Sequence, residues 1–291
     1  MTRLGTSFCL FVLGLIHPTP SFAQESNGPK RVVVIGPNAA EVICGLGACD
    51  RIIAVDKYCV FPPELANRPL IGGLFDADIE RIVALKPDLV VLRGRKESVE
   101  ELCRQQKISL FWDKTENLAD ITTTVLDLST VFSRETEGRK LIAEFRQRLN
   151  AIEKRVAGKP RPRVLLTVGR RPDHLSDIMT AGKGSFLDEM IRIAGGENLF
   201  GDVEMPYPQI STEAIIAKQP DVIVELVPEL ELTRDLREEM TNGWKKLAPL
   251  PATKTGRIYF LDDKNALIPS PRYVEIVEKV SRLLHPDASI P

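Results

Sequence analysis

Histidine is scarce in this 291-residue sequence, which contains only three. A bare zinc or manganese carrier needs three or four converging His, Asp or Glu ligands, and only His174 and His285 follow residue 23. The motifs of a P-loop, a serine-hydrolase elbow and a zinc-protease helix are also missing. In "MTAGKGS", for instance, Gly184 follows Lys183 where a P-loop has Ser or Thr. These gaps argue against a metal-ion carrier and leave an exported hydrolase as a weaker alternative.

An excess of charge of either sign is missing as well. The sequence has 39 basic and 40 acidic residues and a formal net charge of -1. Nucleic-acid binding calls for clustered positive charge, so we expect no nucleic-acid partner.

Long hydrophobic runs are confined to the beginning of the chain. Arg3 precedes the short apolar core "FCLFVLGLI" at 8–16, and "SFA" ends at Ala23 with the small residues that a signal peptidase accepts. This core is too short to cross a bilayer. We therefore predict a signal peptide at 1–23, cleaved after Ala23, and a soluble, exported mature protein.

Four cysteines follow the predicted signal peptide: Cys44, Cys49, Cys59 and Cys103. An oxidising compartment permits disulfides, and four cysteines allow three sets of pairings between which the sequence does not choose. Cys59 lies in a predicted turn and is the favoured member of a disulfide. Cys44 and Cys103 lie on predicted helices, where buried free thiols are the alternative.

Buried strands alternate with helices along the chain. The predicted order in the first half is "RVVVI", "AAEVICGLG", "RIIAV", "DIERIVALKPDLVVL", "SVEELCRQQ", "ISLFW" and "NLADITTTVLDLSTVF". Such alternation indicates an α/β fold with a parallel sheet covered on both faces.

One structural pattern occurs twice. "ERIVALKPDLVVL" at 80–92 returns as "EAIIAKQPDVIVE" at 213–225, and "AEVICGLG" is echoed by "DEMIRIAGG" in the matching order. Pro-Asp before a buried strand is common turn chemistry, which is the plainer explanation. Two echoes in the same order favour duplication, and we predict two Rossmann-like lobes with parallel sheets.

A long amphipathic helix is predicted between the two halves. In "RETEGRKLIAEFRQRLNAIEKRVAGK" the apolar residues recur at steps of one, three, four, three and four, which places them on one helical stripe. The predicted organisation is an N-terminal lobe at 24–133, a connecting helix at 134–158 and a C-terminal lobe at 159–291. Because ligands bind beyond the carboxyl ends of parallel strands, we expect the ligand cleft between the lobes.

Five stretches together resemble the periplasmic substrate-binding proteins of ABC importers that carry cobalamin, ferric siderophores or haem. They are "KYCVFPPE" (57–64), "IERIVALKPDLVV" (79–91), "GGENLFGD" (195–202), "MPYPQISTEAI" (205–215) and "SPRYVEIVEKV" (270–280). The resemblance spans essentially the whole mature chain and is strongest to the cobalamin-binding members. It implies two lobes joined by one long helix, and a monomer that is not an enzyme. It also implies an ABC permease dimer in the inner membrane as the partner, and a metal chelate that is transported rather than kept as a cofactor.

The resemblance also implies residues of the cleft. It places Tyr58, Tyr207 and Asp263 there, although packing in proline-rich turns is the plainer role for the tyrosines. Where cobalamin binders have a tryptophan, this chain has Leu74 and Phe75, and we expect Phe75 at the ligand. Their arginine has no match in "KNALIPSPR". Cobalamin, ferric siderophore and haem therefore all stay open, since a tyrosinate can ligate haem iron.

Arginines follow the predicted strands in both lobes. Arg93 and Arg95 end one strand, and Arg170 and Arg171 end another in the second half. Facing arginine pairs would bind an anionic chelate through charge-assisted hydrogen bonds. Solvation of these loop arginines is the alternative.

The repeated pattern begins with an acid in each copy, Glu80 and Glu213. An acid in the first turn of a helix complements the positive end of the helix dipole. In the family that the chain resembles, acids at these positions dock onto arginines of the two permease subunits. We predict the same docking role for Glu80 and Glu213.

Overall fold

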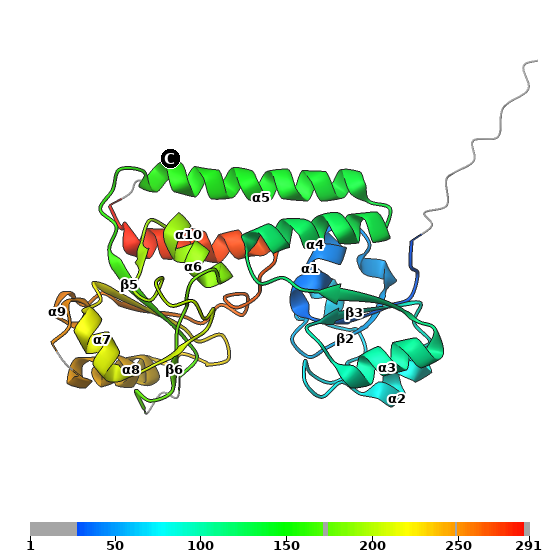
Figure 1. Cartoon of the computed structure of the whole chain (residues 1–291), viewed down its shortest axis with the longest axis horizontal. Coiled ribbons are helices and arrows are strands. Elements are labelled where there is room, and N and C mark those ends of the chain that lie inside the picture. The colour runs from blue at the N-terminus through cyan, green and yellow to red at the C-terminus, as the bar shows by residue number, and fades with distance from the viewer. Residues whose placement is uncertain (1–27, 171–173, 248, 288–291) are drawn as a thin grey trace, which may run out of the picture.

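A computed structural model describes residues 28–170, 174–247 and 249–287. Two α/β lobes lie side by side beneath a long helix, α5 (Figure 1). The predicted signal peptide and Arg171 lie outside the described residues.

The N-terminal lobe is built on a sheet of four parallel strands in the order β2-β1-β3-β4. Its strands are β1 (Val32–Ile35), β2 (Ile52–Val55), β3 (Leu89–Arg93) and β4 (Ser109–Asp113). Its helices are α1 (Pro37–Gly45), α2 (Ile79–Leu85), α3 (Glu97–Gln106) and α4 (Leu118–Val131). All four residues of β1 are buried, as expected for a strand covered on both faces.

The C-terminal lobe contains a second parallel sheet, in the order β10-β9-β5-β7. Its strands are β5 (Arg163–Val168), β7 (Glu197–Asn198), β9 (Val222–Leu226) and β10 (Ile258–Leu261). Its helices are α6 (Phe186–Ile193), α7 (Thr212–Lys218), α8 (Arg234–Leu247), α9 (Pro251–Thr255) and α10 (Val274–Leu284). A small antiparallel pair, β6 (Ile178–Met179) and β8 (Gln209–Ile210), lies beside this sheet.

The two main sheets have the same strand order. Numbered along the chain within each sheet, the strands are arranged second, first, third, fourth in both lobes. The repeated helices also match: α2 is capped by the side chain of Asp78 and α7 by that of Ser211. Each ends in a left-handed residue, Lys86 or Gln219, immediately before Pro-Asp. The predicted fold of two related α/β lobes is confirmed.

Helix α5 (Glu135–Val156) joins the hydrophobic cores of both lobes. Ile142 is buried in the core of the N-terminal lobe, whereas Phe145, Leu149 and Ile152 are buried in that of the C-terminal lobe. Helix α4 lies beneath α5 (Figure 1). Ile121 of α4 is buried in the core of the C-terminal lobe as well. One long connecting helix was predicted, and the structure adds α4 as a second helix shared between the cores.

A disulfide joins Cys44 at the end of α1 to Cys49, which lies just before β2. Cys59 and Cys103 are buried free thiols. The prediction that Cys59 forms a disulfide is wrong, because its side chain packs in the N-terminal core beside Asp56. Burial and the nearby carboxylate raise the pKa of the Cys59 thiol.

Candidate ligand-binding cleft

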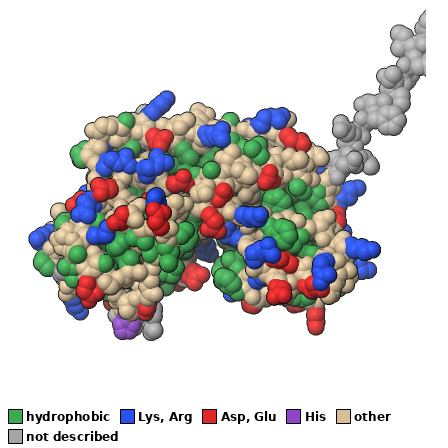
Figure 2. All heavy atoms as spheres, viewed as in Figure 1, with side chains coloured by type: hydrophobic (Ala, Val, Ile, Leu, Met, Phe, Trp, Pro, Cys, Tyr) green, Lys and Arg blue, Asp and Glu red, His purple; other side chains and the backbone are tan. Residues whose placement is uncertain are grey.

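A cavity of about 320 Å³ lies between the two lobes, at the carboxyl ends of their parallel strands. Space-filling atoms show the molecule hollowed between the lobes (Figure 2). The N-terminal lobe lines this cavity with Pro37, Lys57, Tyr58, Val60 and Leu74. The C-terminal lobe lines it with Pro228, Glu229, Lys264, Leu267 and Ile268. The wall is therefore mostly apolar, with three charged side chains.

The turn that carries Tyr58 is held by a buried carboxylate. Asp56, directly after β2, accepts hydrogen bonds from the backbone N–H groups of Gly36 (2.5 Å) and Tyr58 (2.7 Å). Burial raises the pKa of Asp56, and these backbone donors oppose the rise. The half-buried Tyr58 ring lines the cavity, with the Lys57 ammonium 5.1 Å from its centroid. Tyr58 thus lines the cavity, and its contact with a ligand stays a prediction.

Tyr207 lies near a contact between the two lobes. Its ring meets that of Phe186 edge-on, with 6.4 Å between centroids, and the Phe186 N–H donates to the Glu116 carbonyl across the lobes at 3.0 Å. Burial raises the pKa of Tyr207; Glu116 raises it further and Arg93 opposes it. Tyr207 is not among the side chains that line the cavity. The two tyrosines therefore have different surroundings.

Arg93 and Arg95 contact their own lobe. The Arg93 guanidinium donates to the Thr115 carbonyl at 2.8 Å and lies 3.9 Å from the Asp113 carboxylate. Arg95 pairs with Glu100 at 2.9 Å and is 76% exposed. Neither arginine lines the 320 Å³ cavity, so a role of either one in ligand binding stays a prediction.

The prediction that Arg170 faces the ligand is wrong. Its side chain is 1% exposed and donates two hydrogen bonds to Glu225 of β9, at 2.8 and 3.0 Å. The guanidinium also stacks 5.4 Å from the Trp244 ring centroid. Burial raises the pKa of Glu225, and Arg170 opposes that rise. Because this buried carboxylate needs a cation, Arg170 turns into the lobe and away from the cleft.

At two other predicted positions, the neighbouring residue in the sequence lines the cavity instead. Asp263 turns towards helix α10 and pairs with Lys279, and its neighbour Lys264 lines the cavity instead. Phe75 is 91% exposed with the Lys96 ammonium 5.7 Å from its ring centroid, whereas Leu74 lines the cavity. Neither Asp263 nor Phe75 lines the 320 Å³ cavity, so a role of either one in ligand binding stays a prediction.

Sequence reasoning missed three charged residues of the cavity wall: Lys57, Glu229 and Lys264. Each follows a parallel strand, β2, β9 or β10, within three residues of its end. The rule that ligands bind at the carboxyl ends of such strands was the signal that could have identified them. In the described part of the chain, none of the three has an ion-pair partner within 4.0 Å.

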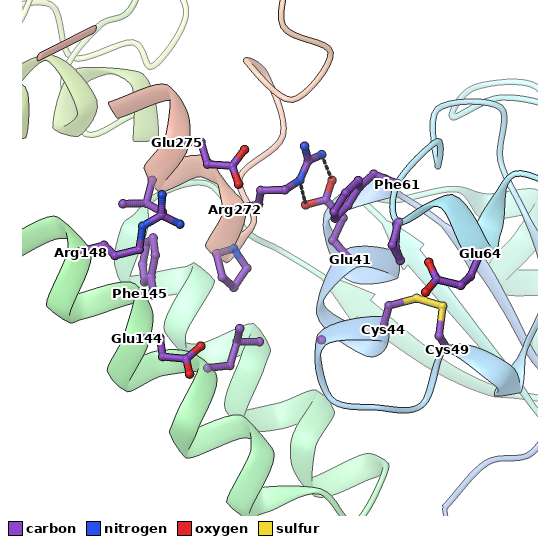
Figure 3. Close-up of a pocket in the computed structure, with 15 residues that line it drawn as sticks. Glu41, Cys44, Cys49, Phe61, Glu64, Glu144, Phe145, Arg148, Arg272 and Glu275 are labelled. Atoms are coloured by element: carbon purple, nitrogen blue, oxygen red, sulfur yellow. Dashed lines mark hydrogen bonds and ion pairs between the residues drawn. A yellow bond between two sulfur atoms is a disulfide. The ribbon is translucent and has the colours of Figure 1, made fainter. Parts of the chain in front are cut away.

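A second cavity, of about 430 Å³, lies where α5 and α10 meet the N-terminal lobe (Figure 3). Arg272 pairs there with Glu41, and its guanidinium lies 3.9 Å from the centroid of the Phe61 ring. The Ser270 hydroxyl also donates to Glu41 at 2.5 Å. These contacts tie the two lobes together and already neutralise the buried charge. The first cavity, whose three charged side chains have no ion-pair partner among the described residues, is therefore the candidate ligand site.

The repeated acids have matching positions. Glu80 and Glu213 are each the second residue of their helix, α2 or α7, and both side chains are exposed. The side chains of the preceding Asp78 and Ser211 accept the capping hydrogen bonds, from backbone N–H groups at 2.9 and 3.2 Å. Neither acid is thus needed as the helix cap. Hydrogen bonds within its own first turn lower the pKa of Glu213.

Comparison with known proteins places this architecture in a family. Residues 32–265 match the periplasmic binding protein family. The chain belongs to that family. Its members are binding proteins rather than enzymes.

Relatives of this periplasmic binding protein include the vitamin B12-binding protein of Vibrio cholerae serotype O1, 28% identical over 268 residues. That alignment covers 91% of this chain and 93% of the relative. The crystal structure of the vitamin B12-binding protein BtuF of Vibrio cholerae matches with a TM-score of 0.73 at 27% identity, covering 88% and 96% of the two chains. A periplasmic heme-binding protein from Pseudomonas aeruginosa has the same fold, with a TM-score of 0.79, 24% identity and coverage of 90% and 94%.

No group of three or more His, Cys, Asp or Glu side chains within 28–170, 174–247 and 249–287 is arranged to hold a metal ion. No helix in the same ranges is both long and apolar enough to cross a membrane.

Proposed function

We propose that this periplasmic binding protein captures a metal chelate, a cobalamin or a ferric siderophore, and delivers it to an ABC importer. The importer is a permease dimer in the inner membrane, and the binding protein reaches the periplasm as a monomer after its signal peptide is cleaved. The observation that carries the proposal is the cavity formed jointly by the carboxyl ends of both parallel sheets. The names of the vitamin B12-binding relatives support the same class of cargo.

The composition of the cavity wall suits such a cargo. Tyr58 offers an aromatic face, and Leu74, Leu267 and Ile268 offer apolar surface on both sides of the cleft. Ligand sites of this kind combine mostly apolar walls with a few polar groups that fix orientation. A large chelate with flat or greasy faces would bury these side chains from water when it binds.

Delivery requires a surface that the permease recognises in both lobes. Glu80 and Glu213 are exposed at the same position of the same repeated helix. Asp78 and Ser211 already cap the two helices, so an interaction with a partner is a reason for an acid at both positions. A two-fold permease would offer each acid an equivalent basic pocket. We propose that the two acids dock there.

The test is a titration of the purified, exported protein with cyanocobalamin, haemin and ferric siderophores, followed by visible absorption. We expect saturable spectral changes at one chelate per chain for cobalamin or a ferric siderophore. Saturation by haemin alone would move the assignment to haem. If none of the three classes binds to the folded protein, the proposed function is wrong. Turnover of a panel of esters and phosphates by the same sample would instead favour the hydrolase alternative.

A further inference from the structure

Each lobe exposes one large apolar side chain far more than the rest. Phe75 is 91% exposed and Met205 is 60% exposed, whereas the next large hydrophobic side chain in the described ranges, Leu70, is 49% exposed. A single exposed apolar residue is common on protein surfaces and needs no explanation. These two residues differ from that ordinary case because of where they lie in the fold.

Phe75 and Met205 lie in equivalent connections of the two lobes. Phe75 belongs to the connection from β2, the second strand of its sheet along the chain, to α2. Met205 belongs to the connection from β7, again the second strand of its sheet, to α7. Both α2 and α7 lie on the side of the molecule away from α5 (Figure 1). Each lobe therefore exposes an apolar side chain shortly before the helix that carries Glu80 or Glu213.

The turn that carries Phe75 is fixed by hydrogen bonds of its own. The Gly73 N–H donates to the Asp76 carboxylate at 3.0 Å. The Asp78 N–H donates to the Ile71 carbonyl at 2.9 Å and closes the base of the turn. Phe75 lies within this closed turn and is exposed all the same.

The loop that carries Met205 is fixed by bonds to a neighbouring segment. Three backbone N–H groups within 180–183 donate to carbonyls within 203–208: Lys183 to Val203 at 2.8 Å, Gly182 to Pro206 at 2.9 Å and Thr180 to Pro208 at 3.0 Å. A Cβ atom on Gly182 would lie 1.9 Å from the Met205 carbonyl oxygen, so only glycine permits this approach. Both apolar side chains thus project from a fixed backbone, and a partner that covers them has little loop entropy to overcome.

We propose that Phe75 and Met205 are apolar contacts for the permease dimer, one for each of its subunits. The inference rests on the proposed function and extends the docking surface beyond Glu80 and Glu213. A partner with two-fold symmetry presents the same surface twice, and the two lobes offer an acid and an apolar side chain twice. Each permease subunit would then have an apolar pocket beside its basic pocket. Covering the apolar side chains supplies affinity, whereas exposed charges chiefly set association rate and partner choice.

The first experiment measures uptake of labelled cyanocobalamin, or of the chelate that the spectral titration identifies. The native host cells express Phe75→Ser, Met205→Ser or the two combined in place of the wild-type protein. Leu126→Ser is the matched control, because Leu126 is also an exposed large hydrophobic residue but lies on α4, beneath α5 (Figure 1). The purified variants are titrated with the same chelate.

We expect each single variant to slow uptake by about tenfold when the binding protein is limiting, as expected for the loss of a buried apolar anchor. The combined variant should abolish uptake. Leu126→Ser should support normal uptake, and all the variants should bind the chelate as the wild type does.

The second experiment identifies the partner by photo-cross-linking in the same cells. A benzophenone amino acid at position 75 or 205 should join the protein to one and the same integral membrane protein, and at position 126 it should not. Cross-linking to a second copy of this chain would instead assign the surface to self-association and overturn the inference.

Other results would also overturn the inference and leave the proposed function in place. They are normal uptake with the combined variant, a loss confined to one of the two single variants, and weaker chelate binding by either one. A wild-type protein that neither binds a chelate nor supports its uptake overturns the proposed function, and this inference with it.

Discussion

The two lobes share a strand order but differ in what they bury at the carboxyl ends of their strands. In the N-terminal lobe, buried Asp56 accepts backbone hydrogen bonds and thereby shapes the turn that carries Tyr58. In the C-terminal lobe, buried Glu225 is satisfied by Arg170 within the lobe itself. One buried acid therefore organises a loop of the cleft, and the other stabilises the interior. Two lobes with the same strand order can therefore use a buried acid near the carboxyl ends of their strands for different purposes.

A second difference concerns how a helix connects to the next strand. Between α1 and β2, the Cys44–Cys49 disulfide closes the connection. Between α6 and β7, Gly195 and Gly196 make the corresponding turn. Gly195 has a φ of +86°, and a Cβ atom there would lie 2.5 Å from the His285 ring. Close packing that only glycine permits thus takes the place of the covalent link.

The largest expected effect is on transport, and it comes from removing the acid that both lobes have at the same position, Glu80 in one and Glu213 in the other. The double variant Glu80→Ala/Glu213→Ala should abolish transport by the cognate permease, because each lobe then lacks the acid that we propose docks onto it. Ligand affinity and melting temperature should stay unchanged, since both acids are exposed and cap neither helix. The measurement is uptake of labelled chelate in cells.

A control for docking is Glu137→Ala/Glu144→Ala, which removes two acids from α5. It should transport normally. Normal transport by the Glu80/Glu213 double variant would show that these residues are acids at helix ends without a role in docking.

The next largest effect concerns the buried ion pair. Arg170→Met should lower the free energy of unfolding by about 3–5 kcal/mol, because it leaves Glu225 buried without its cation. Arg93→Met should cost about 1 kcal/mol, since this side chain is 23% exposed and water can replace its contacts. Denaturant unfolding of the two variants measures the difference. An equal decrease in the free energy of unfolding for both variants would mean that the two arginines stabilise their lobes equally.

The smallest expected effect distinguishes Tyr58, which should matter for ligand affinity, from Tyr207, which should matter for stability. Tyr58→Ala should weaken chelate binding by about 1–3 kcal/mol with little change in stability, because the ring lines the cavity. Tyr207→Ala should chiefly lower stability, because its ring packs against Phe186 in the C-terminal core. Calorimetric titration and thermal unfolding of both variants distinguish these outcomes. A weaker complex with Tyr207→Ala at unchanged stability would contradict the assignment.

The fold was predictable from the sequence because its signals are local. Apolar runs and Pro-Asp turns identified the parallel strands, and the steps between Ile142 and Val156 identified α5. The bridging role of α4 was not predictable, because it depends on Ile121 reaching a core built from residues far along the chain.

The candidate cleft was predictable only in part. Tyr58 was identified through the "KYCVFPPE" turn, and it does line the cavity. Arg170 was misassigned because its position after β5 said nothing of Glu225, which lies 55 residues further on. Asp263 and Lys264 are adjacent in sequence, and only the pairing of Asp263 with Lys279 of α10 decides which of them faces the cleft. Such contacts depend on tertiary structure.

The central claim is that the chelate is held between the lobes, and filling that space tests it most directly. Val60 is 46% exposed and lines the cavity, whereas Val83 is 38% exposed on α2 and does not. Val60→Trp should weaken binding of cyanocobalamin, or of the chelate that the spectral titration identifies, by about 2 kcal/mol, roughly a thirtyfold rise in Kd. Val83→Trp should bind as the wild type does. A folded Val60→Trp protein with unchanged affinity would contradict the account.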